Sequence, residues 1–344
     1  MTIFLTIIAA ILIFALLIFI HELGHFIMAK ATGIRVLEFA LGMGPKLVKF
    51  QKGETLYSIR AFPIGGFCAM EGEDTDSDDP HALNNKPAWA RLLVLVAGAF
   101  MNILLGFVLL CLMIGGQPQV ATTVVGNVEN GSAAYEAGLR TGDEIRKIDG
   151  ARTHLYDDIM WETAGKNGKE TNFTVRRDGE ELDIPIRPRE SGGKYVYGFS
   201  GSAADNSFGL TVKNAYYGTF FYSKLIIESL FDLITGEVKI TQLSGPIGIV
   251  SEIGSAVQEA VKPGGVGLLQ LLNLAVLLTI NLGIFNLLPI PALDGGRILF
   301  VLVEIVRRKP LPPEKEGMVH MIGFAALILL SIFIAFMDVM KLWH

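Results

Sequence analysis

Cysteine and charge are scarce in this sequence, and both shortages narrow what the chain can be. Its 344 residues include only two cysteines, Cys68 and Cys111, and neither has a partner in a Cys-x-x-Cys pattern. This argues against a disulfide framework, and we expect both side chains to be packing residues. Charged residues make up only 18% of the chain, the net charge is -5 and no extended basic run is present. We therefore expect no nucleic-acid partner.

Apolar residues are what the sequence has in excess. They make up 51% of it and the mean hydropathy is +0.46, too high for an ordinary globular protein and too low for a chain that lies wholly in a membrane. Apolar runs long enough to cross a bilayer, which takes roughly 20 residues, occur at 3–30, at 89–114, from 268 onward and at 317–340. We therefore expect a polytopic α-helical membrane protein with four transmembrane helices.

The polar stretches between these runs divide the chain. We expect a first membrane part at 1–117, which contains a membrane-associated β-hairpin region. An inserted α+β domain is expected at 118–200, where strand-like segments alternate with Asn-Gly and Asp-Gly turns. An amphipathic segment rich in Tyr and Phe, with a Gly/Pro loop, follows at 201–262, and we expect its helix to lie in the membrane interface. The second membrane part is expected at 263–344.

The first apolar run ends in His21-Glu22-Leu23-Gly24-His25. Residues four apart lie on one face of a helix, so both imidazoles can bind one metal ion while Glu22 stands beside them as a general base. This is the arrangement of zinc hydrolases. The same letters occur by chance on surface helices, but ionisable residues within a membrane segment are costly and favour a functional site. The motif predicts a zinc site on the first helix.

The third apolar run is interrupted at Asn286-Leu287-Leu288-Pro289-Ile290-Pro291-Ala292-Leu293-Asp294-Gly295-Gly296. Two prolines cannot continue a helix, and irregular backbone at membrane depth is tolerated only where it is buried in protein or faces a wet cavity. Two histidines leave zinc short of the three protein ligands of a catalytic site. Asp294, the carboxylate within the break, is the candidate for the third ligand. Its alternative role is the N-cap of the helix that resumes after it.

Further residues are candidates for catalysis and substrate binding. Asn286 is expected either to donate a hydrogen bond to a developing oxyanion or to satisfy a backbone carbonyl that the prolines leave free. A strand edge around 55–62 is a candidate clamp for an extended substrate, and a purely structural hairpin is an equal alternative. The candidate substrate-binding residues are Thr55, Tyr57, Ile59, Pro289 and Pro291.

Basic residues predict the orientation of the chain. Lysines and arginines gather between the first and second predicted helices, and again after the third at Arg307, Arg308, Lys309 and Lys315. Loops rich in Lys and Arg stay on the cytoplasmic side of a membrane. We therefore expect a multi-pass protein of the cell membrane with both termini and the inserted domain outside. The metal site is then expected inside the membrane, nearer the cytoplasmic face.

The two motifs, with the segments around them, resemble the site-2 protease family of intramembrane zinc metalloproteases, and in particular its bacterial regulator-of-sigma-E protease type. The likeness covers nearly the whole chain. It includes the Gly-Met-Gly-Pro and Pro-Ile-Gly-Gly-Phe segments of the hairpin region, the Leu-Ser-Gly-Pro-Ile-Gly loop and Val-His-Met-Ile-Gly-Phe at the last helix. It implies that His21, His25 and Asp294 hold zinc, that Glu22 is catalytic and that Asn286 assists.

The resemblance extends to the insert and to the second helix. Segments 128–134, 137–145 and 148–150 look like one PDZ domain, whereas longer relatives of the family carry two. Residues 97–102 resemble a family segment that usually has proline where this chain has Ala99. The single PDZ domain leaves a two-domain screening of substrates in doubt, and the change at Ala99 is not expected to affect zinc.

The resemblance implies regulated intramembrane proteolysis in a bacterial inner membrane. In this reaction a peptide bond within a transmembrane segment of another protein is hydrolysed, usually after a first protease has trimmed its outer domain. The expected partners are the lipid bilayer and single-span membrane proteins, such as anti-sigma factors or leftover signal peptides.

Two other functions remain open: a non-catalytic membrane adaptor that binds chain termini through the PDZ domain, and a transporter. The broken helix favours the transporter, but four crossings without an internal repeat do not.

Overall fold

The computed structural model describes residues 2–73, 75, 77–166, 168–238, 244–262, 264–309 and 313–343. The chain forms two compact units, one comprising Met1–Leu109 with Tyr222–His344 and the other Leu110–Phe221. The boundaries between the units fall inside α2 (Ala88–Gly115) and α5 (Phe208–Thr235). We describe the first as the membrane unit and the second as the inserted unit.

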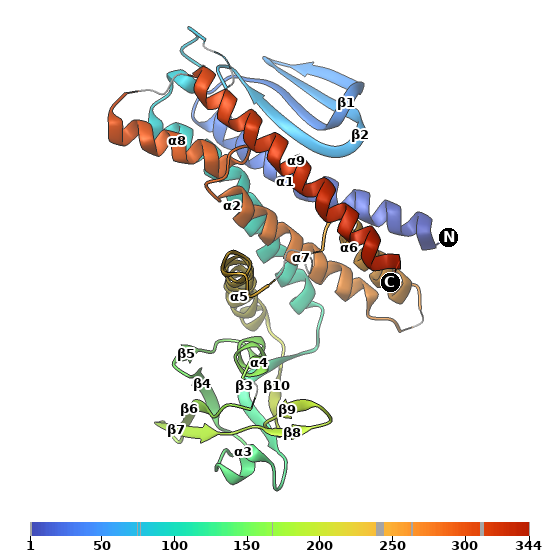
Figure 1. Ribbon diagram of the computed structural model, residues 1–344, viewed down its shortest axis with the longest axis vertical. Helices are drawn as coiled ribbons and strands as arrows, with labels where there is room; N and C mark the ends of the chain where they lie inside the picture. The colour runs from blue at the N-terminus through green and yellow to red at the C-terminus, as the bar shows by residue number, and fades with distance from the viewer. Residues whose placement is uncertain are drawn as a thin grey trace. The chain divides into compact units, whose positions relative to one another are not determined.

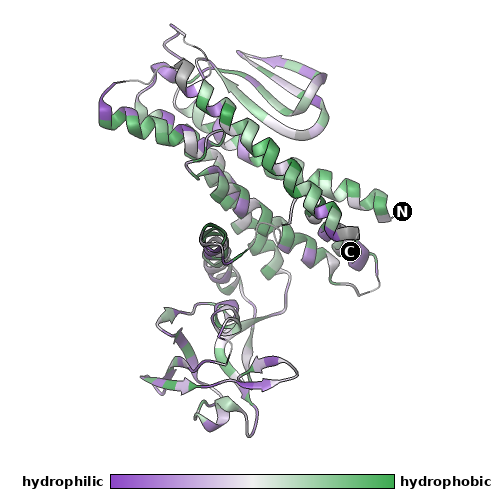
Figure 2. Cartoon of the chain, viewed as in Figure 1, coloured by the Kyte–Doolittle hydropathy of each residue, from purple (hydrophilic) through white to green (hydrophobic). Residues whose placement is uncertain are grey.

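Four helices among the described residues are long and apolar enough to cross a membrane. They are α1 (Thr2–Ala31), α2, α7 (Gly267–Asn286) and the part Glu316–Lys341 of α9 (Pro313–Trp343). Each coincides with an apolar run of the sequence. Figure 2 shows the hydrophobic colour along these helices, and large apolar side chains such as Phe4, Phe100 and Leu329 are exposed on them. Such surfaces suit lipid rather than water, and the prediction of a polytopic membrane protein is confirmed.

The spanning helices can be followed in Figure 1, and glycines determine how closely they pack. At Gly24 of α1, an added Cβ would lie 2.4 Å from the carbonyl oxygen of Ala97 in α2. At Gly106 of α2, it would lie 2.5 Å from Cγ1 of Ile280 in α7. Small residues let helix backbones approach in lipid, where no hydrophobic force drives helices together. As a result α2 contacts α1 on one side and α7 on another.

The helix α6 (Pro246–Ala260) packs against α1, α7 and α9. Asp338 of α9 caps its first turn, because its carboxylate accepts hydrogen bonds from the N–H groups of Gly245 and Gly248 at 3.1 and 2.9 Å. The Gly/Pro loop predicted from the sequence is therefore the start of a helix. Leu243, the first residue of that loop, lies outside the described residues.

The hairpin region consists of β1 (Val36–Lys52) and β2 (Thr55–Met70), with the short helix η1 (Leu83–Asn85) after it. Each strand pairs along two stretches. Segment 36–41 pairs with 66–70 on one side and with 56–59 on the other, and 56–59 pairs in turn with 48–51. The lateral order is therefore 66–70, 36–41, 56–59 and 48–51, so the outer segments of this sheet are 66–70 and 48–51.

This register corrects the edge expected around 55–62. Tyr57 pairs with both Phe39 and Phe50, and Ile59 pairs with both Leu41 and Val48, so these residues lie inside the sheet. Thr55 is buried, and its hydroxyl donates to the Val36 carbonyl at 2.8 Å. The strand-like segments and turns were visible in the sequence, but which segments pair depends on contacts between distant residues.

A half-buried carboxylate holds the folded-back strands together. Glu38 of β1 accepts hydrogen bonds from Ser58 at 2.7 Å, Lys46 at 2.9 Å and Arg60 at 2.8 Å. Burial raises the pKa of Glu38, but these three hydrogen bonds outweigh burial and lower the pKa to about 2. The carboxylate therefore stays charged at neutral pH and ties β1 to the segment of β2 that contains Ser58 and Arg60.

The inserted unit is an α+β domain. Its antiparallel sheet has the order β10 (Phe199–Asp205), β3 (Gln119–Val128), β4 (Glu144–Ile148), β6 (Thr171–Arg177) and β7 (Glu180–Ile186), with β5 (Ala151–Arg152) beside β4. The helices α3 (Ala133–Glu136) and α4 (Tyr156–Ala164) and the hairpin β8–β9 (Arg189–Ser191 and Lys194–Val196) complete it. Phe173, Ile145 and Ile148 form the centre of its core. The sheet includes β10, which continues beyond residue 200.

Candidate metal centre

Three ligand-type side chains from two helices converge in the membrane unit. His21 and His25 lie one turn apart on α1, and Asp294 is the first residue of α8 (Asp294–Arg307). The two Nε2 atoms of the histidines are 3.2 Å apart. Asp294 Oδ2 lies 3.2 Å from the first of these nitrogens and 3.3 Å from the second. Within the described ranges, no other group of His, Cys, Asp and Glu side chains has a spacing that suits a metal ion.

These separations fit one tetrahedral zinc ion. Zinc binds histidine nitrogen at about 2.0–2.1 Å, and two such ligands at the tetrahedral angle are about 3.3 Å apart. Asp294 Oδ2 is buried, yet it has no hydrogen-bond partner among the described residues. A buried oxygen of this kind needs an explanation, and a metal ion supplies one. Three protein ligands also leave a fourth position open, as a catalytic site requires.

The helix α2 orients both imidazoles. His25 Nδ1 lies 2.8 Å from the carbonyl oxygen of Val94. A carbonyl only accepts, so Nδ1 carries the proton and Nε2 directs its lone pair at the metal position. His21 Nδ1 lies 3.4 Å from the side-chain amide of Asn102, which is completely buried. The atom of Asn102 that faces Nδ1 is the amide nitrogen Nδ2, so Asn102 of α2 holds the ring of His21 on the neighbouring helix α1.

A glycine makes room for the two imidazoles. At Gly98 of α2, an added Cβ would lie 2.3 Å from His25 Nε2 and 2.7 Å from His21 Cε1. Sequence analysis did not identify Gly98 as part of the site. Its only signal was the small-residue segment 97–99, which does not distinguish a helix contact from a contact with metal ligands.

The break between α7 and α8 positions the carboxylate. Leu293 is the N-cap of α8 and Asp294 is its first helical residue, so the alternative N-cap role for Asp294 is wrong. An added Cβ at Gly295 would lie 2.0 Å from the Leu288 carbonyl oxygen, and one at Gly296 would lie 2.6 Å from that of Ile290. The double glycine therefore lets the broken segment fold tightly against the first turn of α8.

Glu22 lies beside the histidines and faces an outer segment of the hairpin sheet. Its carboxyl is close to both histidines and to the backbone amide of Cys68. At Gly66, an added Cβ would lie 3.4 Å from Glu22 Cγ and 3.0 Å from Ile18 of the same helix. Glu22 therefore stands between the metal position and the strand segment 66–70. The structure thus brings together four of the predicted residues: the two histidines, Glu22 and Asp294.

The remaining predicted residues lie in the broken segment. Asn286 is the last residue of α7 and is half-buried, and its side chain makes no hydrogen bond with a described residue. The alternative in which it satisfies a carbonyl freed by the prolines therefore has no support among the described residues. Pro289 is exposed, and Pro291 is half-buried against Gly323 of α9.

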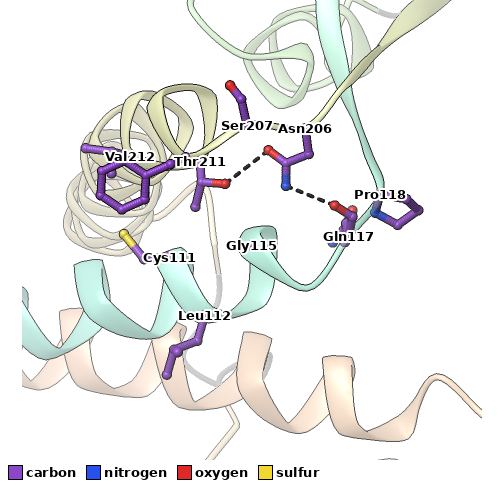
Figure 3. A pocket seen from close by; sticks show the side chains of 10 residues that line it. Cys111, Leu112, Gly115, Gln117, Pro118, Asn206, Ser207, Thr211 and Val212 are labelled. Carbon is purple, nitrogen blue, oxygen red and sulfur yellow. Dashed lines mark hydrogen bonds between the residues drawn. The ribbon is translucent and has the colours of Figure 1, made fainter.

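A separate cavity of about 470 Å³ lies within the inserted unit, between the end of α2 and the start of α5 (Figure 3). Asn206 crosses it, donating to the Gln117 carbonyl at 2.9 Å and accepting from the Thr211 hydroxyl at 3.0 Å. Cys111 and Leu112 form part of its wall. Among the described residues that line this cavity, none has an acidic or basic side chain.

The comparisons with known proteins agree with this geometry. The family model described as Peptidase family M50 matches residues 9–330. A Clostridium acetobutylicum protein provisionally named a zinc metalloprotease is 37% identical over 341 residues, which cover 98% of each chain. The regulator of sigma-W protease RasP of Bacillus subtilis is 33% identical over 425 aligned residues, covering 98% of this chain and 99% of that protein.

A third relative, the zinc metalloprotease RasP of Geobacillus kaustophilus, is 31% identical over 421 aligned residues, covering 98% of both chains. The family match includes both halves of the metal centre, the histidines of α1 and the aspartate of α8. The chain belongs to peptidase family M50, the site-2 protease family, and is a zinc metalloprotease.

Proposed function

We propose that this protein is an intramembrane endopeptidase that hydrolyses a peptide bond within a transmembrane segment of another membrane protein. Its zinc ligands are His21, His25 and Asp294. The observation that carries the proposal is the position of the ligand group: both histidines belong to α1, a helix that is apolar enough to span a bilayer. A hydrolytic centre on such a helix acts on bonds that are held inside the membrane.

The side chains around the metal position have separate roles in this proposal. Zinc bound there supplies Lewis-acid chemistry, polarising a carbonyl and acidifying a water molecule. Glu22 takes the proton from the attacking water and passes it to the leaving amine. The side-chain amide of Asn286 makes no hydrogen bond with a described residue, and in this proposal it donates to the oxyanion that develops at the scissile carbonyl. Val94 keeps His25 in the tautomer that presents Nε2, and Asn102 holds the ring of His21 in position.

A helical substrate must be unwound before hydrolysis, because its amide bonds are hidden in the helix. The outer segment 66–70 of β2 pairs on one side only and lies beside Glu22. It can therefore hold an extended substrate by adding it as a further strand. Thr55, Tyr57 and Ile59 support this edge from inside the sheet. Pro289 and Pro291 belong to the broken segment before Asp294, and in this proposal they contact the substrate.

The substrate class and orientation are part of the same proposal. The basic residues flanking the spanning helices favour a cytoplasmic position for the hairpin region and for the loop after α8. The inserted unit is then extracytoplasmic and acts as a single PDZ-type domain. In this unit the edge strand β10 lies beside the helix α4, where Tyr156 packs over Gly201. The substrates are single-span proteins already trimmed outside, such as anti-sigma factors or leftover signal peptides.

Replacing the general base tests the chemistry. Glu22→Gln is expected to lower cleavage of a co-expressed, outer-truncated single-span protein by about 10²- to 10⁴-fold, the usual contribution of a general base. Zinc content of the purified protein stays unchanged, because Glu22 is not a ligand. Full-rate cleavage of the substrate in cells that contain this variant, together with its loss when the inserted unit is deleted, would favour the adaptor instead, with another protease as the enzyme.

Replacing Gly98 tests the ligand geometry. In Gly98→Ala the new Cβ meets His25 Nε2, and overpacking costs about 1–3 kcal/mol. Zinc binding is therefore expected to weaken by about 10- to 100-fold. Gly115→Ala is the matched control in the same helix, because its nearest contact is 3.6 Å away. Equal zinc affinities in the two variants, measured by competition with a chelator, would contradict the assigned ligands.

Cysteine crosslinking tests the strand edge. In a Glu22→Gln, Cys68→Ser and Cys111→Ser background, Ala69→Cys is expected to crosslink to cysteines placed within the transmembrane segment of the same truncated substrate. Lys49→Cys on the other outer segment, 48–51, is the control and is expected not to react. A crosslink at position 49 and none at position 69 would place the substrate on the wrong side of the sheet for this proposal.

A further inference from the structure

The segment Val319-His320-Met321-Ile322-Gly323-Phe324 of α9 has no role in the chemistry described above, although it contains a histidine in a membrane-spanning helix. His320 Nδ1 accepts a hydrogen bond from the backbone N–H of Ala292 at 2.9 Å. Ala292 belongs to the broken segment and lies two positions before Asp294. The histidine therefore binds the backbone of the loop that carries the proposed third zinc ligand.

The conformation of that loop explains why it needs an external partner. Ala292 has a φ of 77°, in the left-handed region that residues other than glycine rarely adopt. A side chain that accepts from its N–H holds the residue in this conformation, because the hydrogen bond is lost when the backbone rotates away. The proline on its N-terminal side cannot donate a backbone hydrogen bond, so the Ala292 N–H is the first donor after Pro291.

Other contacts keep the imidazole and the loop in place. The His320 ring packs edge-on against Phe300 of α8, with centroids 5.5 Å apart and planes at 68°. One turn further along α9, an added Cβ at Gly323 would lie 2.5 Å from Pro291 Cβ and 2.7 Å from its carbonyl oxygen. The close approach at Gly323 thus lets α9 lie directly on the loop. This brings His320 within hydrogen-bonding distance of Ala292.

The protonation of the ring follows from its partner. Nδ1 accepts from an N–H group, so in the neutral ring the proton is on Nε2. Nε2 lies 3.9 Å from Glu316 Oε1, one turn earlier on α9. The nitrogen that faces the loop is therefore engaged with a backbone amide. His320 acts on the metal centre through residue 292 and not as a ligand.

We propose that His320 is a positioning residue of the metal centre, which fixes the backbone at Ala292 and so holds the Asp294 carboxylate at ligand distance from the two histidines. This inference rests on the proposed role of Asp294 as a zinc ligand. It gives α9 an indirect part in zinc affinity, although none of the described residues of α9 belongs to the ligand group. Partners that orient ligands from outside the first coordination shell change metal affinity by about 10- to 100-fold when they are removed.

The test compares two substitutions at the same position in the full-length, detergent-solubilised protein. His320→Leu removes the acceptor and is expected to weaken zinc binding by about 10-fold or more in competition with a chelator. His320→Asn is expected to bind zinc like the unmodified protein, because its Oδ1 stands where Nδ1 stood and can accept from Ala292. Met321→Leu, at an exposed neighbouring position, is the control and is expected to change nothing.

Two further readouts separate positioning from general damage. The visible absorption of the Co²⁺-loaded protein depends on ligand number and geometry, and it is expected to change in His320→Leu and to stay unchanged in His320→Asn. Gly323→Ala, which keeps the histidine but pushes on Pro291, is expected to weaken zinc binding as His320→Leu does. This second variant serves as the test if His320→Leu does not fold.

The results that overturn the inference are distinct from those that overturn the proposed function. Unchanged zinc affinity in both His320→Leu and Gly323→Ala, or equal losses in His320→Leu and His320→Asn, would remove His320 from the metal centre. The reference variant Asp294→Ala is expected to lose stoichiometric zinc in the same assay. If Asp294→Ala kept its zinc, the ligand assignment itself would fail, whatever the His320 variants did.

Discussion

The structure depends on bringing three donor atoms from helices far apart in the chain within about 3.3 Å of one another. His21 and His25 come from the first spanning helix, and Asp294 begins a helix that follows the break after α7. A buried carboxylate beside two imidazoles is unfavourable unless the groups are paired or bind an ion. Gly98 allows α2 to approach the imidazoles, Val94 and Asn102 orient them, and the folded loop of α7–α8 brings the carboxylate to them.

The proposed hydrolysis inside a membrane adds a second constraint, because water and an extended peptide must both reach this centre. The hairpin sheet meets this constraint: its segment 66–70 lies beside Glu22 and pairs on one side only. The strand edge and the proposed general base therefore lie next to each other. A structural hairpin and a substrate clamp are thus not exclusive alternatives, since the inner segments 36–41 and 56–59 support the outer one.

Local patterns in the sequence predicted the parts of this arrangement that depend on local spacing. The four-residue interval between His21 and His25 places both on one helix face wherever that helix packs, and the apolar runs give the four spans directly. Asp294 was identifiable because a carboxylate in a proline-broken membrane segment has few other uses. The features that sequence reasoning missed all depend on pairing between distant segments: the true edge of the hairpin sheet, the contact of Gly98 with the imidazoles, and the hydrogen bond from Ala292 to His320. A glycine or a histidine within a helix looks the same in sequence whether it faces lipid or a metal ligand.

X-ray absorption at the zinc edge of the purified full-length protein tests the central claim most directly. The predicted result is one zinc ion per chain, bound by two imidazole nitrogens and by carboxylate or water oxygen at about 2.0–2.2 Å. In Asp294→Ala, the same measurement is expected to show loss of bound zinc. A stoichiometric ion with a sulfur neighbour at about 2.3 Å, or a spectrum without imidazole scattering, would contradict the account.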